Sequence, residues 1–322
     1  MGSDGDFSFP VIDFSDPDLK PGTTTWDLVK SQVHKAAEEY GCFQAFFNKI
    51  PQELQKGMNG ALEEMFQLPE EIKKCNVSEK PFHGYLGSSS SIYESLAIDE
   101  PDIFNKVENF TNVLWPEGNT NFSNVVHSFS HAVVELDQTI RRMILEGLGV
   151  EKYADEHINS AKYLLRVSKY EAPRTTDKKI GLSAHTDTNF ITILCQNQVN
   201  GLEIQTKNGD WIPVQYSADS FFVLVGEAFR AWVNNRVYSP YHRVMIAGDS
   251  KRYSGVMFSM PKENDIIKAI EELVDEEHPL VYKPFCYGEY LKQRLAYRYA
   301  DRFAEGVLRN IIAPPLKEYF GV

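Results

Sequence analysis

Three residues with side chains suited to binding a metal ion occur in two short segments of the chain. His185 and Asp187 are separated by one residue in GLSAHTDTNFITIL, and His242 follows 55 residues after Asp187, in SPYHRV. If the first segment is a β-strand, His185 and Asp187 point to the same face, because side chains alternate between the two faces of a strand. The H-x-D triplet alone is a weak signal, since it also arises by chance in surface turns.

Two histidines and one carboxylate fit two kinds of metal site. On one face of an octahedral ion they form the facial triad used for iron(II), which leaves three positions open for a co-substrate and dioxygen. The same ligand types also occur in hydrolytic zinc sites. The three residues therefore leave iron and zinc open.

A further polar pair distinguishes these alternatives. Arg252 lies ten residues beyond His242, and Ser254 follows two residues later, so the two share one face of an expected strand. A guanidinium presents a planar fork suited to a carboxylate, and a serine hydroxyl can donate to the same group. The pair predicts a receptor for the far carboxylate of a dicarboxylic acid whose other end binds the metal. A zinc hydrolase needs no such receptor, and the other interpretation of Arg252 is a solvated arginine at a strand end.

The segments that must position these residues change in character near the middle of the chain. The spacing of apolar residues predicts helices over 26–40, 54–65 and 122–148 after a short strand at 9–14, and 78–105 resembles a long loop. From residue 163 short β-type runs follow one another, and Asn208-Gly209 between two of them is a hairpin signal.

This pattern predicts a mainly β fold with flanking helices (α+β), in which an antiparallel sandwich or barrel, including the jelly roll, is packed against helices at both ends of the chain. Gly41 and Gly149 are expected to end helices, and Thr24 or Thr25 to begin the first one. Another helix is expected after Pro284. We expect three regions: a mostly helical region at 1–155, the β core at 156–265 and a C-terminal helical segment at 266–322.

Composition excludes several other classes of protein. The 322 residues include 33 Lys and Arg against 45 Asp and Glu, and a net charge of −12 disfavours nucleic acids and anionic membranes as partners. We find no apolar run of about 20 residues and no secretory signal at the N-terminus. The four cysteines have no C-x-x-C spacing, which favours reduced thiols. We expect a cytoplasmic monomer that binds a small molecule and neither nucleic acid nor membrane.

Taken together, H-x-D, the distal His and R-x-S resemble the plant 2-oxoglutarate- and Fe(II)-dependent dioxygenase family. The likeness extends over nearly the whole chain, from FPVIDFS and FQLPEEIKK to NGLEIQTKNGDWIPV and ELVDEEHPLVYKPF. KRYSGVMFSMPK and SPYHRVMIAG look most like the AOP-like branch, and KPGTTTW and FTNVLWPEGN resemble the relative that closes the ring of deoxypodophyllotoxin. The resemblance implies a double-stranded β-helix, a jelly-roll variant.

The same resemblance implies the roles of individual residues. His185, Asp187 and His242 would hold Fe(II), and Arg252 and Ser254 would bind 2-oxoglutarate, with ascorbate as an activator. Tyr170 matches the tyrosine that contacts 2-oxoglutarate, because SKYEAP looks like the family's N-x-Y-x-P stretch. The substrate would be a small, fairly apolar plant metabolite. Its candidate contacts are Phe190, Phe258, Met260, Asn189, Phe104 and Tyr93.

Several positions depart from the family pattern and concern the substrate rather than the reaction. They are Phe47-Asn48-Lys49, Gly226-Glu227, Val233-Asn234-Asn235, Ser168 and Thr188-Asn189-Phe190. Three alternatives stay open: an oxidase with the same triad that does not use 2-oxoglutarate, a catalytically silent binding protein of the same fold, and a zinc hydrolase.

Overall fold

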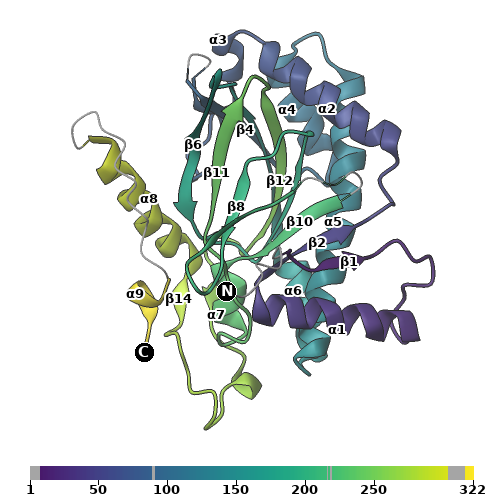
Figure 1. Cartoon of the computed structure of the whole chain (residues 1–322), viewed down its shortest axis with the longest axis vertical. Helices are drawn as coiled ribbons and strands as arrows, with labels where there is room; N and C mark the ends of the chain where they lie inside the picture. Colours follow the sequence, from purple (N-terminus) through teal and green to yellow (C-terminus); the bar gives the residue numbers. More distant parts are fainter. Residues whose placement is uncertain (1–7, 89–90, 216, 218–219, 304–315) are drawn as a thin grey trace, which may run out of the picture.

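The computed structural model describes residues 8–88, 91–215, 217, 220–303 and 316–322. Its centre is a pair of β-sheets with helices around them (Figure 1). The larger sheet has eight strands, in spatial order β1 (Val11–Asp13), β2 (Cys42–Phe46), β10 (Ser220–Val225), β7 (Ile191–Gln196), β12 (Arg252–Met260), β5 (Lys162–Tyr170), β4 (Tyr93–Asp99) and β3 (Leu86–Gly87). The smaller sheet has β6 (Thr175–His185), β11 (His242–Gly248), β8 (Leu202–Gln205) and β9 (Trp211–Pro213). A separate pair joins β13 (Ile266–Ile267) to β14 (Phe285–Cys286).

The two large sheets pack against each other through alternate side chains. One contact cluster joins Leu194 and Phe222 of the larger sheet to Ile204 of the smaller one. Another joins Tyr170 of β5 to Val244 of β11. Because side chains alternate along a strand, these contacts define the inner face of each sheet.

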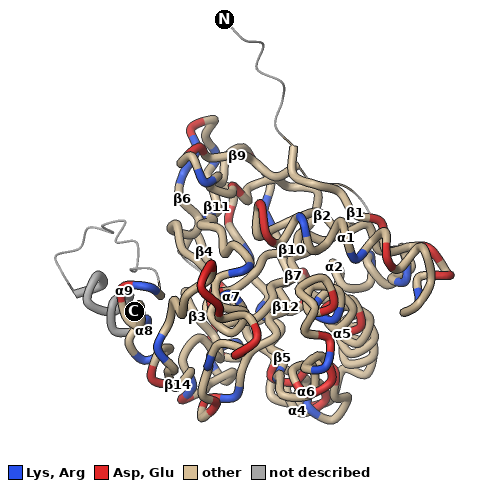
Figure 2. The backbone as a smooth tube through the Cα atoms, turned by 90° about the horizontal axis from the view of Figure 1, so that it is seen from below, with Lys and Arg blue, Asp and Glu red and all other residues tan. Residues whose placement is uncertain are grey.

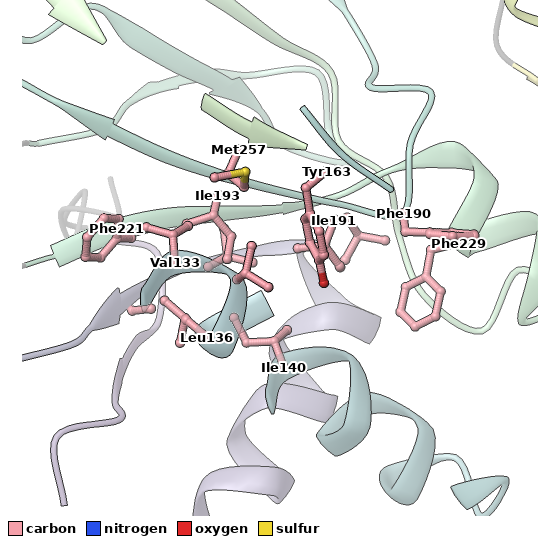
Figure 3. Packing of buried hydrophobic residues seen from close by; sticks show 14 of the residues in the cluster. Val133, Leu136, Ile140, Tyr163, Phe190, Ile191, Ile193, Phe221, Phe229 and Met257 are labelled. Carbon is pink, nitrogen blue, oxygen red and sulfur yellow. The ribbon is translucent and has the colours of Figure 1, made fainter. Parts of the chain in front are cut away.

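Helices cover the outer face of the larger sheet. The described residues form these helices on this face and elsewhere: α1 (Thr24–Glu39), α2 (Gln52–Gln67), α3 (Glu70–Lys73), α4 (Phe104–Leu114), α5 (Thr120–Gly147), α6 (Ala154–Ser160), α7 (Glu227–Trp232), α8 (Tyr287–Phe303) and α9 (Leu316–Phe320), with short 3-10 turns at Glu151–Tyr153 and Glu271–Leu273. The long helix α5 presents Val133, Leu136 and Ile140 to Ile193 and Met257 of the sheet (Figure 3). Helix α8 lies on the other side of the sheets (Figure 1).

The ends of α1 show how local sequence sets an element. Thr23 caps the helix, because its hydroxyl oxygen accepts a hydrogen bond from the Trp26 amide at 3.2 Å. Such a cap stabilises a helix by about 1 kcal/mol. The expected caps, Thr24 and Thr25, were therefore wrong by one or two positions. Gly41 follows the helix at φ +66, where a Cβ would lie 2.1 Å from the Tyr238 carbonyl oxygen, so only glycine fits.

The β-type runs predicted between residues 163 and 260 all form strands, and the predicted helices form as well. The loop prediction for 78–105 was wrong in part, because β4 lies within it and pairs along its whole length with β5. Strands from the first third of the chain thus complete a sheet whose other strands follow residue 160. The three-region division at 155 and 265 stays a prediction, and residues 304–315 of its last region lie outside the described residues.

Positions of Lys and Arg and positions of Asp and Glu are intermixed along the backbone of the helices and loops (Figure 2). All four cysteines lie in the described part of the chain and are free, as expected for reduced thiols. Burial raises the pKa of the Cys195 thiol to about 11, so this thiol stays protonated at neutral pH. Among the described residues, none of the helices is both long and apolar enough to cross a bilayer.

Candidate metal and dicarboxylate site

The structure brings His185, Asp187 and His242 together at one end of the smaller sheet. His185 ends β6 and is paired directly with His242, the first residue of β11. One ligand atom from each of the three residues lies within 4.8 Å of the other two. Oδ1 of Asp187 is 3.6 Å from Nε2 of each imidazole. A single ion between these three atoms would accept all of them as ligands, and the donor set fits Fe(II).

Each imidazole is oriented from behind by a backbone carbonyl. Nδ1 of His185 lies 2.8 Å from the Ser183 carbonyl oxygen, and Nδ1 of His242 lies 3.4 Å from that of Pro240. A proton on Nδ1 donates to the carbonyl and leaves the Nε2 lone pair free for a metal. Such a contact fixes the tautomer of a metal-binding histidine and the direction of its ring.

The second oxygen of Asp187 is held by a short hydrogen-bonded chain. The Thr192 hydroxyl donates to Oδ2 of Asp187 at 2.6 Å, and the Asn189 amide donates to the Thr192 oxygen at 3.2 Å. All three side chains are buried. Because Oδ2 is occupied in this way, Oδ1 is the oxygen that faces the histidines. Asn189, which is also a candidate substrate contact, thus lies behind a metal-facing carboxylate and supports it through Thr192.

Thr192→Val is expected to lower the affinity for Fe(II) by about 10- to 100-fold, the usual effect of losing a partner behind a metal ligand. The substitution preserves the shape of the side chain while removing the donor to Asp187. Anaerobic calorimetric titration with Fe(II) measures the change. Thr139→Val is the matched control, because Thr139 is a partly exposed residue of α5 whose hydroxyl donates to the Glu135 carbonyl oxygen, away from the metal group. Equal iron affinity in the two variants would contradict the role of Thr192.

The loop that carries Asp187 is supported by residues far along the chain. The Glu227 amide donates to the Asp187 carbonyl at 2.8 Å, and Arg294 of α8 donates to the Thr186 carbonyl at 2.9 Å. The Glu227 carboxylate in turn accepts hydrogen bonds from the Tyr290 hydroxyl and, at 2.9 Å, from the Leu316 amide. This glutamate, one of the departures noted in the sequence, therefore connects the metal-facing loop to the C-terminal helices.

Arg252 is buried on the inner face of β12 and has neutral partners. Its guanidinium donates to the Gln196 side-chain oxygen at 2.6 Å and to the Ser254 hydroxyl at 3.3 Å. Its Nε has no hydrogen-bond partner within the described part of the chain. Burial lowers the pKa of Arg252, whereas the nearby Tyr170 acts in the opposite direction. A buried guanidinium with an unused donor fits an anionic ligand such as the far carboxylate of 2-oxoglutarate.

Two more residues shape the surroundings of Arg252. The Tyr170 ring lies 5.1 Å from the guanidinium carbon, and burial raises the pKa of its hydroxyl, which therefore remains a donor. Gly201 of the neighbouring loop passes so close that a Cβ there would lie 3.1 Å from Cδ and 3.2 Å from Nε of Arg252. Tyr170 and Ser254 thus lie beside Arg252, as expected, and Gly201 adds a backbone wall.

Of the residues expected to contact substrate, some lie on the inner face of the larger sheet and others lie on its outer side. Phe258 is opposite Thr192 on the inner face, and Tyr93 packs on Tyr170 with ring centroids 5.1 Å apart. Met260 lies at the end of β12, against the outer core. Phe104 packs on His127, between α4 and α5. The structure does not bring Phe190 to the metal group, because its ring lies in the core beside Phe229 (Figure 3) and 4.3 Å from that of His157.

Thr192, Gln196 and Arg166 were missed in the sequence, although their spacing carried a signal. Thr192 and Gln196 alternate with outward residues along β7, and Arg166 shares a face with Ser168 and Tyr170 on β5. Reading every second residue of these strands would have placed all three on the inner face. Glu227 and Arg294 carried no such signal, because their contacts with the metal-facing loop depend on the tertiary fold.

Comparisons with known proteins agree with this geometry. The family model described as 2OG-Fe(II) oxygenase superfamily matches residues 157–261, and the model described as non-haem dioxygenase in morphine synthesis N-terminal matches residues 9–113. The probable 2-oxoglutarate-dependent dioxygenase AOP1.2 of Arabidopsis thaliana is 51% identical over 88% of this chain and 90% of its own. The Arabidopsis 2-oxoglutarate-dependent dioxygenase AOP3 is 33% identical over 86% of this chain and 90% of its own.

Solved structures extend the likeness to the fold. A rice dioxygenase for auxin oxidation superposes with a TM-score of 0.79 at 26% identity and covers 94% of this chain and 99% of its own. The Arabidopsis dioxygenase for auxin oxidation 1, solved as a 2-oxoglutarate complex, gives a TM-score of 0.76 at 25% identity and covers 84% of this chain and 100% of its own. The predicted jelly-roll core with flanking helices is confirmed.

Proposed function

Because the chain belongs to the 2OG-Fe(II) oxygenase superfamily and is an Fe(II)- and 2-oxoglutarate-dependent dioxygenase, we propose that it oxidises an unactivated C–H bond of a small apolar plant specialised metabolite. The outcome would be hydroxylation, desaturation or oxidative ring closure. The observation that supports this assignment is the convergence of His185, Asp187 and His242 together with a buried Arg252, whose partners among the described residues are neutral.

In this proposal each residue has a defined task. His185, Asp187 and His242 hold Fe(II), while Arg252 and Ser254 bind the far carboxylate of 2-oxoglutarate and Tyr170 lines the same place. The bound iron supplies the oxidation chemistry, in which dioxygen and 2-oxoglutarate are consumed and succinate and carbon dioxide are released. The protein itself orients both reactants and keeps bulk water away from the reacting carbon.

The substrate would lie against the partly exposed residues of the inner face. Val256 and Phe258 on β12 remain partly exposed although the residues between and beside them are buried. Tyr93 of β4 is also partly exposed on this face. These apolar and aromatic surfaces support a small, largely apolar substrate. Phe258 lies closest in register to the metal group, through its pairing with Thr192.

The test is a coupled reaction. Protein supplied with Fe(II), 2-oxoglutarate and ascorbate is incubated with a plant metabolite extract, and mass spectrometry follows metabolites that gain an oxygen atom or lose a pair of hydrogens. We expect succinate to accumulate in step with the product. A His185→Ala variant is the control and should form neither. Product formation that persists without 2-oxoglutarate would contradict the proposal and indicate an oxidase.

A further inference from the structure

A second arginine is buried on the inner face of the larger sheet. Arg166 of β5 lies two residues before Ser168 and four before Tyr170, and in the register it stands between Val256 of β12 and Ala97 of β4. Side chains at alternate positions share a face, so Arg166 points to the same side as Tyr170 and Arg252. Only 8% of its surface is exposed.

Buried cations elsewhere in the described residues are paired with carboxylates. The buried lysines and arginines are Lys73, Arg141, Arg166, Lys169, Arg252 and Arg294. Lys73 and Lys169 pair with Glu94, Arg141 pairs with Asp137, and Arg294 lies 4.0 Å from Glu227. Within the described residues, Arg166 and Arg252 are the two buried cations for which no carboxylate partner is found, and both lie on the inner face.

The partners of Arg166 are neutral groups. Its guanidinium donates to the Ser95 hydroxyl at 2.7 Å and to the Phe82 carbonyl oxygen. The Asp99 carboxylate, which attracts it from farther away, pairs with His83 instead. Burial lowers the pKa of Arg166 against the raising effect of Tyr93. The pKa of Arg294 is raised despite burial, because several nearby groups, Glu227 among them, act together against it.

Burying a guanidinium without an anionic partner lowers the stability of a protein, because the charge loses its hydration. An anion together with further hydrogen bonds can offset this loss. At Arg252 the proposed anion is 2-oxoglutarate. We propose that Arg166 binds an anionic oxygen group of the oxidised metabolite, a carboxylate, so that the substrate is an apolar acid. This inference rests on the proposed function and narrows its substrate class.

The position of Arg166 separates this role from that of Arg252. Arg252 and Ser254 lie toward one end of β12, Phe258 lies toward the metal end, and Arg166 stands opposite Val256 between them, one strand farther from β7. A carboxylate there would meet the planar fork of the guanidinium, while the apolar remainder of the molecule would extend over Val256 and Phe258 toward the metal group.

The test compares acids with their uncharged counterparts. Phenylacetate, cinnamate and indole-3-acetate are titrated, each beside its primary amide, into the Fe(II)-loaded wild-type protein under anaerobic conditions with saturating 2-oxoglutarate. We expect at least one acid to bind about tenfold more tightly than its amide, because only the acid offers a charge-assisted, bidentate partner to Arg166. In Arg166→Gln this preference should fall to less than about twofold.

Two further variants keep the result interpretable. Arg166→Lys retains the charge without the planar fork and should show an intermediate preference for acids over amides. This variant tests the inference even if Arg166→Gln does not fold. Arg142→Gln is the matched control, because Arg142 is a partly exposed arginine of α5 paired with Asp155. It should bind acids and amides as the wild type does.

Three results would overturn the inference: acids and amides that bind alike to the wild type, an acid preference that survives in Arg166→Gln, or a loss of 2-oxoglutarate affinity as large as the loss of acid preference. The last would assign Arg166 to the co-substrate. Failure of the proposed function has a different signature, since wild-type protein would then not bind 2-oxoglutarate, which a titration without any acid shows.

Discussion

Arg252→Met is expected to weaken 2-oxoglutarate binding by about 30- to 5,000-fold. Truncating one partner of a buried, hydrogen-bonded charge pair costs about 2–5 kcal/mol, and each 1.4 kcal/mol is a factor of ten. The guanidinium is buried, and the methionine keeps much of its apolar volume. Calorimetric titration of 2-oxoglutarate into anaerobic, Fe(II)-loaded protein gives the affinity directly.

The companion variants set the scale of this effect. Ser254→Ala removes a single hydroxyl donor and should cost about 0.5–1.5 kcal/mol, the usual net worth of one hydrogen bond. Arg142→Met, on the outer helix α5, should leave the affinity unchanged. Iron affinity should be retained in all three variants, since none removes a proposed metal ligand. An Arg252→Met protein that binds 2-oxoglutarate as well as Ser254→Ala does would refute the proposed clamp.

His242→Ala is expected to abolish stoichiometric iron binding and, with it, turnover. Loss of a partner behind a metal ligand costs up to about 100-fold in affinity, and loss of the ligand itself should exceed that. Asp187 and His185 would remain, but two ligands cannot form the facial triad. Metal analysis of anaerobically purified protein measures the iron content, and release of succinate measures turnover.

Folding and metal binding must be separated in this experiment. His278→Ala is the matched control, because His278 is an exposed histidine that contacts Asp275 in a surface turn. Both variants should melt as cooperatively as the metal-free wild type. If His242→Ala retained full iron content, the triad would be ruled out as the metal site. Zinc rather than iron in the wild type, with activity, would indicate a hydrolytic centre.

Much of the site could be predicted from the sequence, because the spacing of its residues along strands indicates which side chains share a face. The alternation within β12 placed Arg252 and Ser254 on one face, and the structure keeps them there. The H-x-D spacing identified His185 and Asp187 as neighbours, but it assumed that both residues lie within one strand. His185 ends β6, but Asp187 lies beyond the strand, in a loop held by the Glu227 amide. Contacts with residue 227 are set by the fold and leave no local pattern.

The strand β4 shows what the sequence alone could not provide. The segment that contains it is poor in apolar periodicity and rich in serine and glycine, which favoured a loop. Glu94 lies within this strand. In the structure this side chain is fully buried, because Lys73 and Lys169 neutralise it from α3 and β5. Phe190 shows a second limit of the sequence. It follows the metal-facing segment closely along the chain, but its ring packs into the outer core, which its sequence position did not indicate.

The dependence of the metal-facing loop on Glu227 bears on how the protein matures during synthesis. Tyr290 and Leu316 bond to the Glu227 carboxylate and Arg294 bonds to the loop itself, and all three residues follow β11 along the chain. A nascent chain on the ribosome can pair β6 with β11 long before these residues have emerged. We therefore expect durable iron acquisition to wait until these residues have emerged, so that removal of Tyr290, Arg294 and Leu316 would yield a core that loads metal poorly.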